Sequence, residues 1–120
     1  MKQEFTTELL EKIVARLKDS INPEAIYLFG SYASGQAKED SDIDLLIVIP
    51  DLNQERHDVV LKGRRSLRDI IFPIDLIVCT QAEMEKWADV KCTLIYTVTR
   101  KGKILYESER RTSKRMAQTG

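Results

Sequence analysis

The chain has 120 residues, of which 19 are basic and 19 are acidic, so its formal net charge is zero. Hydrophobic residues make up 42% and charged residues 32%, a balance that is typical of one folded domain and argues against intrinsic disorder. A neutral chain is not expected to bind nucleic acid, and its longest purely apolar run, Leu45–Ile49, is far too short to span a membrane.

The termini and the cysteines predict the compartment. The N-terminus shows no signal-peptide pattern and the C-terminus no anchor motif, so we expect a cytoplasmic protein. Cys79 and Cys92 lie in apolar stretches without paired spacing, and we expect both to be reduced and buried.

Hydrophobic periodicity and turn residues predict alternating helices and strands. In chain order, the predicted elements are a helix over about 4–19, a strand over 25–29, a short helix over 31–37, a strand over 42–49, a helix whose apolar face runs from Val59 to Ile71, a strand over 74–79, a helix that starts at the capping box 80–83, a helix over 90–100 and a strand over 103–106. Residues 90–100 also alternate as a strand would, but the helix is favoured. This interleaving predicts an α/β domain around one mixed β-sheet of about four strands.

We predict one domain over residues 1–107, followed by a polar tail. Residues 108–120 contain four basic side chains, one acidic side chain and almost nothing to bury. Subtracting them from the totals leaves 15 basic and 18 acidic residues in the domain, a net charge of −3. We expect the tail to be solvated or disordered.

Three aspartates stand where a purely structural strand would not place them. Asp42 and Asp44 are two residues apart, so in an extended segment both carboxylates point to the same face. Asp75 is the second residue of the apolar strand over 74–79. Strands disfavour aspartate, and three carboxylates at strand starts suggest a compensating cation such as Mg²⁺ or Mn²⁺. The alternative is a turn at Asp42, with Asp44 paired to a lysine or an arginine.

Gly30 and Ser31 end the strand over 25–29 and begin a short helix. Glycine lets a phosphate approach the backbone, and the helix start and the serine hydroxyl offer hydrogen-bond donors. The alternative is that Ser31 is an ordinary helix N-cap. Taken alone, a Gly-Ser pair carries almost no information.

The spacing of these motifs resembles that of a known superfamily. Ten residues separate Ser31 from Asp42-Ile43-Asp44, within the stretch F-G-S-Y-A-S-G-Q-A-K-E-D-S-D-I-D-L-L-I-V, and P-I-D-L-I-V supplies the third aspartate. The pattern resembles the polymerase β-like nucleotidyltransferases, and among them the minimal nucleotidyltransferase (MNT) proteins, which are similarly short and often end in a G-K-x-L-Y-E-like strand. The resemblance covers most of residues 4–107 and implies a nucleotidyltransferase fold, like the polymerase β palm.

The resemblance also implies roles for these residues. Asp42 and Asp44 would hold the metals that bridge the nucleotide triphosphate, two Mg²⁺ ions or Mn²⁺ in their place, and Asp75 would complete the second site and help to activate the acceptor hydroxyl. Gly30 and Ser31 would bind the β- and γ-phosphates. The family usually transfers AMP from ATP and releases pyrophosphate. Many relatives carry arginine where this chain has Ser34; Lys38 is a possible substitute, although a solvated turn lysine is the favoured interpretation.

The MNT resemblance further implies a protein partner. MNT proteins typically act as antitoxins that adenylylate a helical HEPN ribonuclease, typically on a tyrosine, and silence it, which implies a hetero-oligomer. Two alternatives stay open: nucleotide transfer to a small hydroxylated molecule, and a non-catalytic antitoxin that acts through contact alone. His57 is interpreted as a surface residue, and Trp87 and Tyr96 as core or interface residues rather than adenine-stacking residues.

Overall fold

A computed structural model describes residues 4–52 and 55–118. Its four-stranded mixed sheet has the order β3-β2-β1-β4, in which β1 is antiparallel to β2 and β4 and β2 is parallel to β3. The strands are β1 (Ala25–Phe29), β2 (Ile43–Ile49), β3 (Ile74–Thr80) and β4 (Lys103–Glu107). The helices are α1 (Thr7–Ile21), α2 (Ser31–Ser34), α3 (Arg56–Ser66), α4 (Gln81–Trp87), α5 (Leu94–Lys101) and α6 (Glu109–Gln118). The predicted fold class is therefore confirmed.

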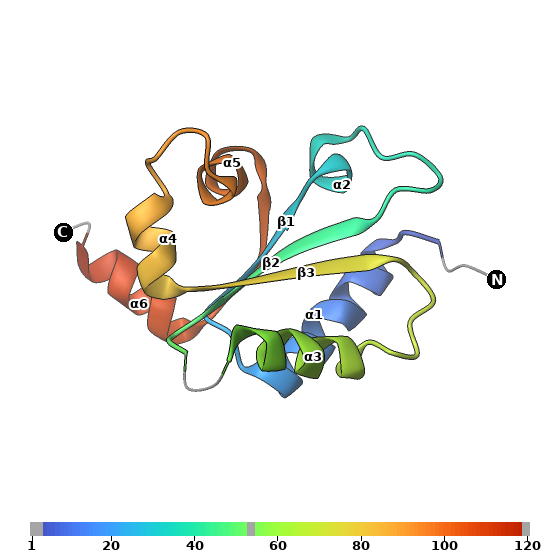
Figure 1. Cartoon of the computed structure of the whole chain (residues 1–120), viewed down its shortest axis with the longest axis horizontal. Helices are drawn as coiled ribbons and strands as arrows, with labels where there is room; N and C mark the ends of the chain where they lie inside the picture. Colours follow the sequence, from blue (N-terminus) through green and yellow to red (C-terminus); the bar gives the residue numbers. More distant parts are fainter. Residues whose placement is uncertain (1–3, 53–54, 119–120) are drawn as a thin grey trace.

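Helices cover both faces of the sheet. Figure 1 shows α1 and α3 together on one side, and α2, α4 and α5 on the other. None of the helices in the described part of the chain is long and apolar enough to cross a membrane. The predicted capping box forms at the start of α4, where Thr80 and Glu83 each bond the other's backbone N–H.

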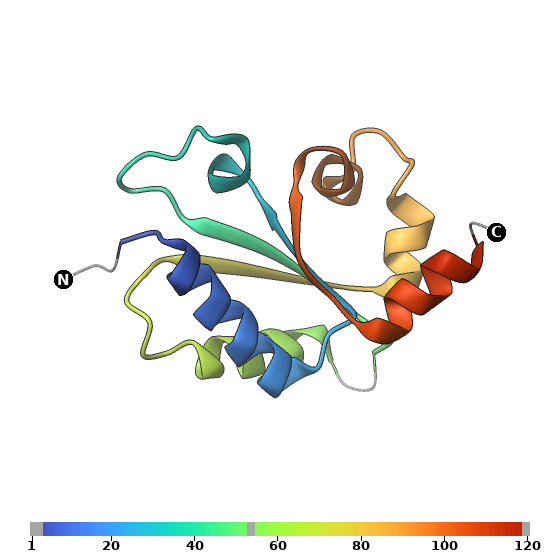
Figure 2. The same cartoon turned by 180° about the vertical axis from the view of Figure 1, so that it is seen from behind.

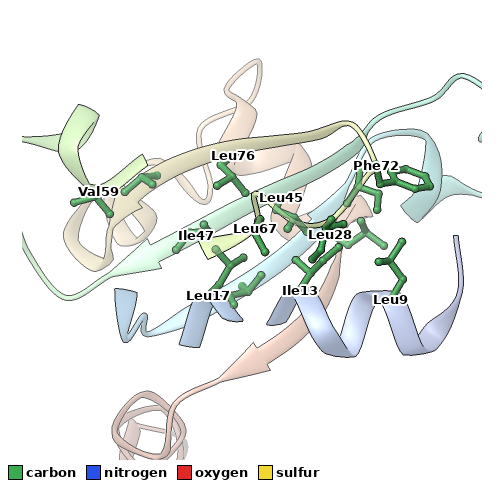
Figure 3. Close-up of a cluster of buried hydrophobic side chains, with 14 of the residues drawn as sticks. Leu9, Ile13, Leu17, Leu28, Leu45, Ile47, Val59, Leu67, Phe72 and Leu76 are labelled. Atoms are coloured by element: carbon green, nitrogen blue, oxygen red, sulfur yellow. The ribbon is translucent and has the colours of Figure 1, made fainter. Parts of the chain in front are cut away.

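The core lies on both sides of β2, the central strand. Leu45 and Ile47 pack against α1 and α3 in the larger cluster, while Leu46 and Val48 face α4 and α5. Figure 3 shows the larger cluster, in which Leu9, Ile13 and Leu17 project from one stripe of α1 toward the sheet. A strand covered on both faces explains why this run is apolar without alternation, as the sequence predicted.

The C-terminal segment differs from the expected disordered tail, because residues 109–118 form α6. Figure 2 shows α6 following β4 at the end of the molecule opposite α2. Its first turn contacts the sheet: Arg110 pairs with the buried Glu24, and Arg111 donates a hydrogen bond to the Tyr27 hydroxyl over 2.7 Å. The Ser108 hydroxyl also bonds Glu24, over 3.0 Å. Glu24 is only 4% exposed, and a buried carboxylate needs such partners. The composition of residues 108–120 does not indicate these contacts.

Other boundaries shift slightly. The helix marked by Val59 ends at Ser66, and its predicted last apolar residues, Leu67 and Ile70, pack against the core from the following turns. The segment 90–100 contains a helix, α5, as favoured. The predicted strands differ from the structure by a residue or so at their ends.

The two cysteines differ in exposure, so the expectation of burial is wrong for Cys92. Cys79 is buried in β3, and burial raises the pKa of its thiol to about 12. Cys92 is exposed in the turn between α4 and α5.

We therefore expect one thiol of the native protein to react promptly with a disulfide reagent at about pH 8, because only a thiolate attacks and Cys79 stays protonated there. The measurement is a thiol titration of wild type, Cys92→Ser and Cys79→Ser. Cys92→Ser should lose the prompt reaction and Cys79→Ser should keep it. Two promptly reacting thiols in the wild type would contradict the burial of Cys79.

Candidate active site

Two of the predicted aspartates lie side by side at the start of neighbouring strands. Asp44 of β2 and Asp75 of β3 are register partners in the parallel pair. Because side chains alternate along a strand, both lie on the face that carries Leu46 and Ile77, which α4 and α5 cover farther along. Asp44 is half-buried, whereas 57% of the Asp75 side chain is exposed.

Asp42 lies directly before β2, which begins at Ile43, so strand alternation neither places its side chain on the face of Asp44 nor directs it away. Asp42 is exposed and borders a cavity of about 400 Å³ together with Arg64 and Pro73. Within residues 4–52 and 55–118, no group of three or more acidic, histidine or cysteine side chains converges tightly enough to hold a metal ion by itself.

The surroundings of Asp44 disfavour its negatively charged form. Partial burial raises the pKa of its carboxyl, and the negative charges of Asp75 and Asp42 raise the pKa further. Asp42 and Asp75 are therefore both within electrostatic reach of Asp44. Asp44 is the most buried of the three, whereas Asp42 and Asp75 are exposed.

This electrostatic penalty predicts that Asp44→Asn stabilises the metal-free protein. The folded pKa of Asp44 lies above its unfolded value, so ionised Asp44 lowers the free energy of unfolding, and this cost appears as the pH rises through the folded pKa. In EDTA near neutral pH, the Tm of Asp44→Asn should exceed that of wild type, by a small margin because solvent screens a half-exposed charge, and the gap should close as the pH falls toward the ordinary aspartate pKa. Thermal unfolding across this pH range measures it, and a lower Tm for Asp44→Asn would contradict it.

Gly30 fits against the Asp44 carboxylate. β1 and β2 pair Phe29 with Asp44, so the chain turns at Gly30 directly beside this carboxylate. A Cβ at Gly30 would lie 2.2 Å from Asp44 Oδ2, and Gly30 has φ +74°, which other residues rarely adopt. The Gly-Ser turn is therefore built around Asp44, a contact that the sequence spacing alone could not show.

Ser31 begins α2 but does not cap it. The N-cap is Gly30, which offers no side-chain cap, so the alternative of a serine N-cap does not describe the structure. With only four residues, α2 contributes little dipole, and its position depends on packing. Tyr32 stacks on Phe5 with ring centroids 4.1 Å apart and meets Phe72 edge-on at 5.9 Å. This aromatic cluster, which the sequence reasoning missed, anchors the turn that carries Gly30 and Ser31.

Basic side chains near the aspartates are sparse. Arg64 of α3 lies 3.8 Å from Asp75 Oδ1, and both side chains are more than half exposed, so this ion pair is weak. No described basic residue forms an ion pair with Asp44, in contrast to the alternative raised from the sequence. Ser34 and Lys38 are exposed, and α2 carries no basic residue.

A model of the family described as "Polymerase beta, Nucleotidyltransferase" matches residues 11–111, which include Gly30 and all three aspartates. The chain belongs to this family. The match confirms the predicted enzyme class, a nucleotidyltransferase, and agrees with the mixed four-stranded sheet. The roles of the individual site residues remain predictions.

Curated relatives of this nucleotidyltransferase come from Methanocaldococcus jannaschii. "Putative protein adenylyltransferase MJ1379" is 37% identical over 71 residues, which are 58% of this chain and 71% of that protein. "Putative protein adenylyltransferase MJ1305" is 34% identical over 73 residues, which are 59% of this chain and 47% of that protein. The match thus spans about half of the longer relative.

Solved structures share the fold. "A putative nucleotidyltransferase from Sulfolobus solfataricus" superposes with a TM-score of 0.60 and 25% identity, covering 87% of this chain and 82% of that one. A chain in a crystal structure of a "toxin-antitoxin with AMP-PNP" gives a TM-score of 0.55 at 25% identity, covering 91% of this chain and 82% of that one.

Proposed function

We propose that this nucleotidyltransferase transfers AMP from ATP to a hydroxyl group of a partner protein and that the reaction requires Mg²⁺. The observation that carries the proposal is the position of Asp44, whose carboxylate lies against Gly30 and in register with Asp75. The adenylyltransferase names of the curated relatives and the AMP-PNP in the similar toxin–antitoxin structure support it.

The donor set fits a hard divalent cation. Carboxylate oxygens suit Mg²⁺ or Mn²⁺, and Mg²⁺ sites commonly use one or two protein carboxylates, leaving other positions to phosphates and water. The Asp44–Asp75 pair meets this description, because it is accessible and the negative charge of Asp44 lacks a compensating partner. The Asp42 side chain is exposed, so packing does not prevent it from joining the pair. Two ions held by Asp42, Asp44 and Asp75 would neutralise the triphosphate and stabilise the attacking and leaving oxygens.

The chain's own residues would position the reactants. The turn at Gly30 and Ser31, where β1 ends and α2 begins, would bind the β- and γ-phosphates, and the Ser31 hydroxyl would donate a hydrogen bond to them. The acceptor oxygen forms a bond to the α-phosphorus while the bond to pyrophosphate breaks. Asp75, the more exposed member of the register pair, takes the proton of the acceptor hydroxyl.

The partner we propose is a toxin, specifically a HEPN-type ribonuclease that adenylylation would silence. The similar toxin–antitoxin structure supports a toxin partner. Because the toxin supplies the acceptor hydroxyl, the two proteins would form a hetero-oligomer.

A transfer assay with ATP labelled at the α-phosphate tests this proposal. Incubated with Mg²⁺ and the protein encoded beside it, this nucleotidyltransferase should label that protein, whereas ATP labelled at the γ-phosphate should not. Turnover with small hydroxylated compounds and no protein would favour a small-molecule acceptor instead. If an Asp42→Ala/Asp44→Ala variant still rescued growth from the toxin, neutralisation by contact alone would replace the enzymatic proposal.

A further inference from the structure

An open apolar pocket lies between α4, α5 and the sheet. Its volume is about 330 Å³, within the range of small-molecule sites. Trp87 of α4 and Leu94 of α5 contribute to its wall and stay 36% and 41% exposed, although both are large apolar side chains. Leu46 of β2 and Ile77 of β3 form its floor.

The pocket begins next to the aspartate pair. Leu46 and Ile77 are register partners, two residues beyond Asp44 and Asp75 on the same face. At about 3.3 Å per residue, the floor lies roughly 7 Å along the strands from the carboxylates. Figure 1 shows α2 near the start of β2 and β3, and α4 and α5 farther along them. If a triphosphate binds at Gly30 with its α-phosphate at the carboxylates, the distance from the α-phosphate to the pocket is about the length of a ribose. The nucleobase would then reach the pocket.

The polar groups of the pocket already have partners. Arg56 forms two hydrogen bonds to Glu83, of 2.9 and 3.1 Å, and a third to the Val78 carbonyl. The Thr93 hydroxyl donates to the Val90 carbonyl over 2.8 Å. Lys86 Nζ lies over the Trp87 ring, 5.0 Å from its centroid, and so covers one face of the indole. What the pocket offers a ligand is apolar surface and the rest of the indole ring, which suit a flat uncharged group.

We propose that this pocket binds the nucleobase of the nucleoside triphosphate, with Trp87 as the stacking residue and Leu46, Ile77 and Leu94 as apolar contacts. The inference rests on the proposed function, because it takes the triphosphate to lie at Gly30 and the aspartates. Trp87 thus becomes a substrate-binding residue, contrary to its interpretation from sequence as a core or interface side chain.

The pairing of the polar groups also predicts weak base selectivity. Stacking tolerates any base, since every base has an aromatic face, whereas discrimination needs free hydrogen-bond donors or acceptors at the base edge. The adenine and guanine nucleotides should therefore bind with affinities that differ only a few-fold.

Trp87 is the single tryptophan of the chain, so tryptophan emission, excited at a wavelength that the four tyrosines do not absorb, reports on this pocket. The probes are the α,β-methylene analogue of ATP, which cannot undergo transfer, and inorganic tripolyphosphate, each with Mg²⁺. The nucleotide analogue should change the Trp87 emission in a saturable way, and tripolyphosphate should leave it unchanged while still binding by calorimetry.

Variants measured by calorimetry complete the test. Trp87→Ala and Leu94→Asn should each lower the affinity for the nucleotide analogue, Trp87→Ala by about 10-fold, and leave the affinity for tripolyphosphate unchanged. Trp87→Phe should retain most of the affinity, because it keeps an aromatic face. Ile104→Ala is the matched control, since Ile104 is 47% exposed on β4 at the opposite edge of the sheet and should have no effect.

The base pocket would be overturned if folded Trp87→Ala and Leu94→Asn bound the nucleotide analogue as tightly as wild type does. It would also be overturned if these variants lost affinity for tripolyphosphate as strongly as for the analogue. If the wild type labels its partner while these variants bind the analogue normally, only the base pocket fails. If the wild type binds no nucleotide, the proposed function fails as well.

Discussion

Replacing Asp44 by Asn is expected to lower the rate of AMP transfer by about a thousandfold or more. Metal-assisted charge stabilisation contributes several kcal/mol to such reactions, and about 1.4 kcal/mol corresponds to each factor of ten in rate. Asn keeps the size of the side chain against Gly30 but removes the charge that would hold Mg²⁺. Single-turnover labelling of the partner protein measures the effect.

The loss should occur in a protein that is folded and no less stable than wild type, given the strain on ionised Asp44. Mg²⁺ should raise the Tm of wild type and leave that of Asp44→Asn unchanged. Asp51→Asn is the control, because Asp51 is exposed beyond the opposite end of β2 and should transfer AMP at the wild-type rate. Transfer by Asp44→Asn within about tenfold of wild type would remove Asp44 from the catalytic site.

Gly30→Ala is expected to reduce transfer by about a hundredfold or more, since displacement of a catalytic group by as little as 1 Å can cost that much. The new Cβ would lie 2.2 Å from Asp44 Oδ2, so the carboxylate must move away from its place beside Asp75. Backbone strain at φ +74° should also cost about 1–3 kcal/mol of stability. Rate and thermal unfolding are measured on the same preparation.

Gly35→Ala separates the two effects of the Gly30 substitution. Gly35 has φ +78° and no heavy atom within 4 Å of an added Cβ, so its substitution strains the backbone without touching Asp44. It should lower the Tm and preserve transfer. Because Gly30 would act through Asp44, a Gly30→Ala/Asp44→Asn double variant should be about as inactive as Asp44→Asn alone. Fully additive losses would show that Gly30 acts independently of the carboxylate.

The fold, and the placement of Asp44 and Asp75 at the starts of two strands, were largely predictable from local signals. A double-faced apolar run identified the central strand, and aspartates at two strand starts marked one end of the sheet. Their in-register pairing follows from the parallel β2–β3 arrangement, which no local pattern specifies. The same applies to Gly30, whose contact with Asp44 depends on the antiparallel register of β1 and β2.

The features that escaped prediction depend on contacts distant in sequence. The buried Glu24 binds Ser108 and Arg110, more than 80 residues away, and this pairing distinguishes an ordered helix from a polar tail. The exposure of Trp87 in the pocket between α4, α5 and the sheet depends on how these helices pack. Cys92 lies in an apolar stretch, but it occupies a turn, where its φ is +72°. Its exposure therefore could not be predicted from the hydrophobicity of its neighbours in sequence.

The central claim is that the Gly30–Asp44–Asp75 arrangement is a site for AMP transfer to a protein. The most direct measurement is the intact mass of the partner protein after co-expression with wild type or with Asp44→Asn. We expect a mass increase of one or more AMP units with wild type and an unmodified partner with Asp44→Asn. A partner of unchanged mass in both cases, from cells that wild type protects equally well, would contradict the claim.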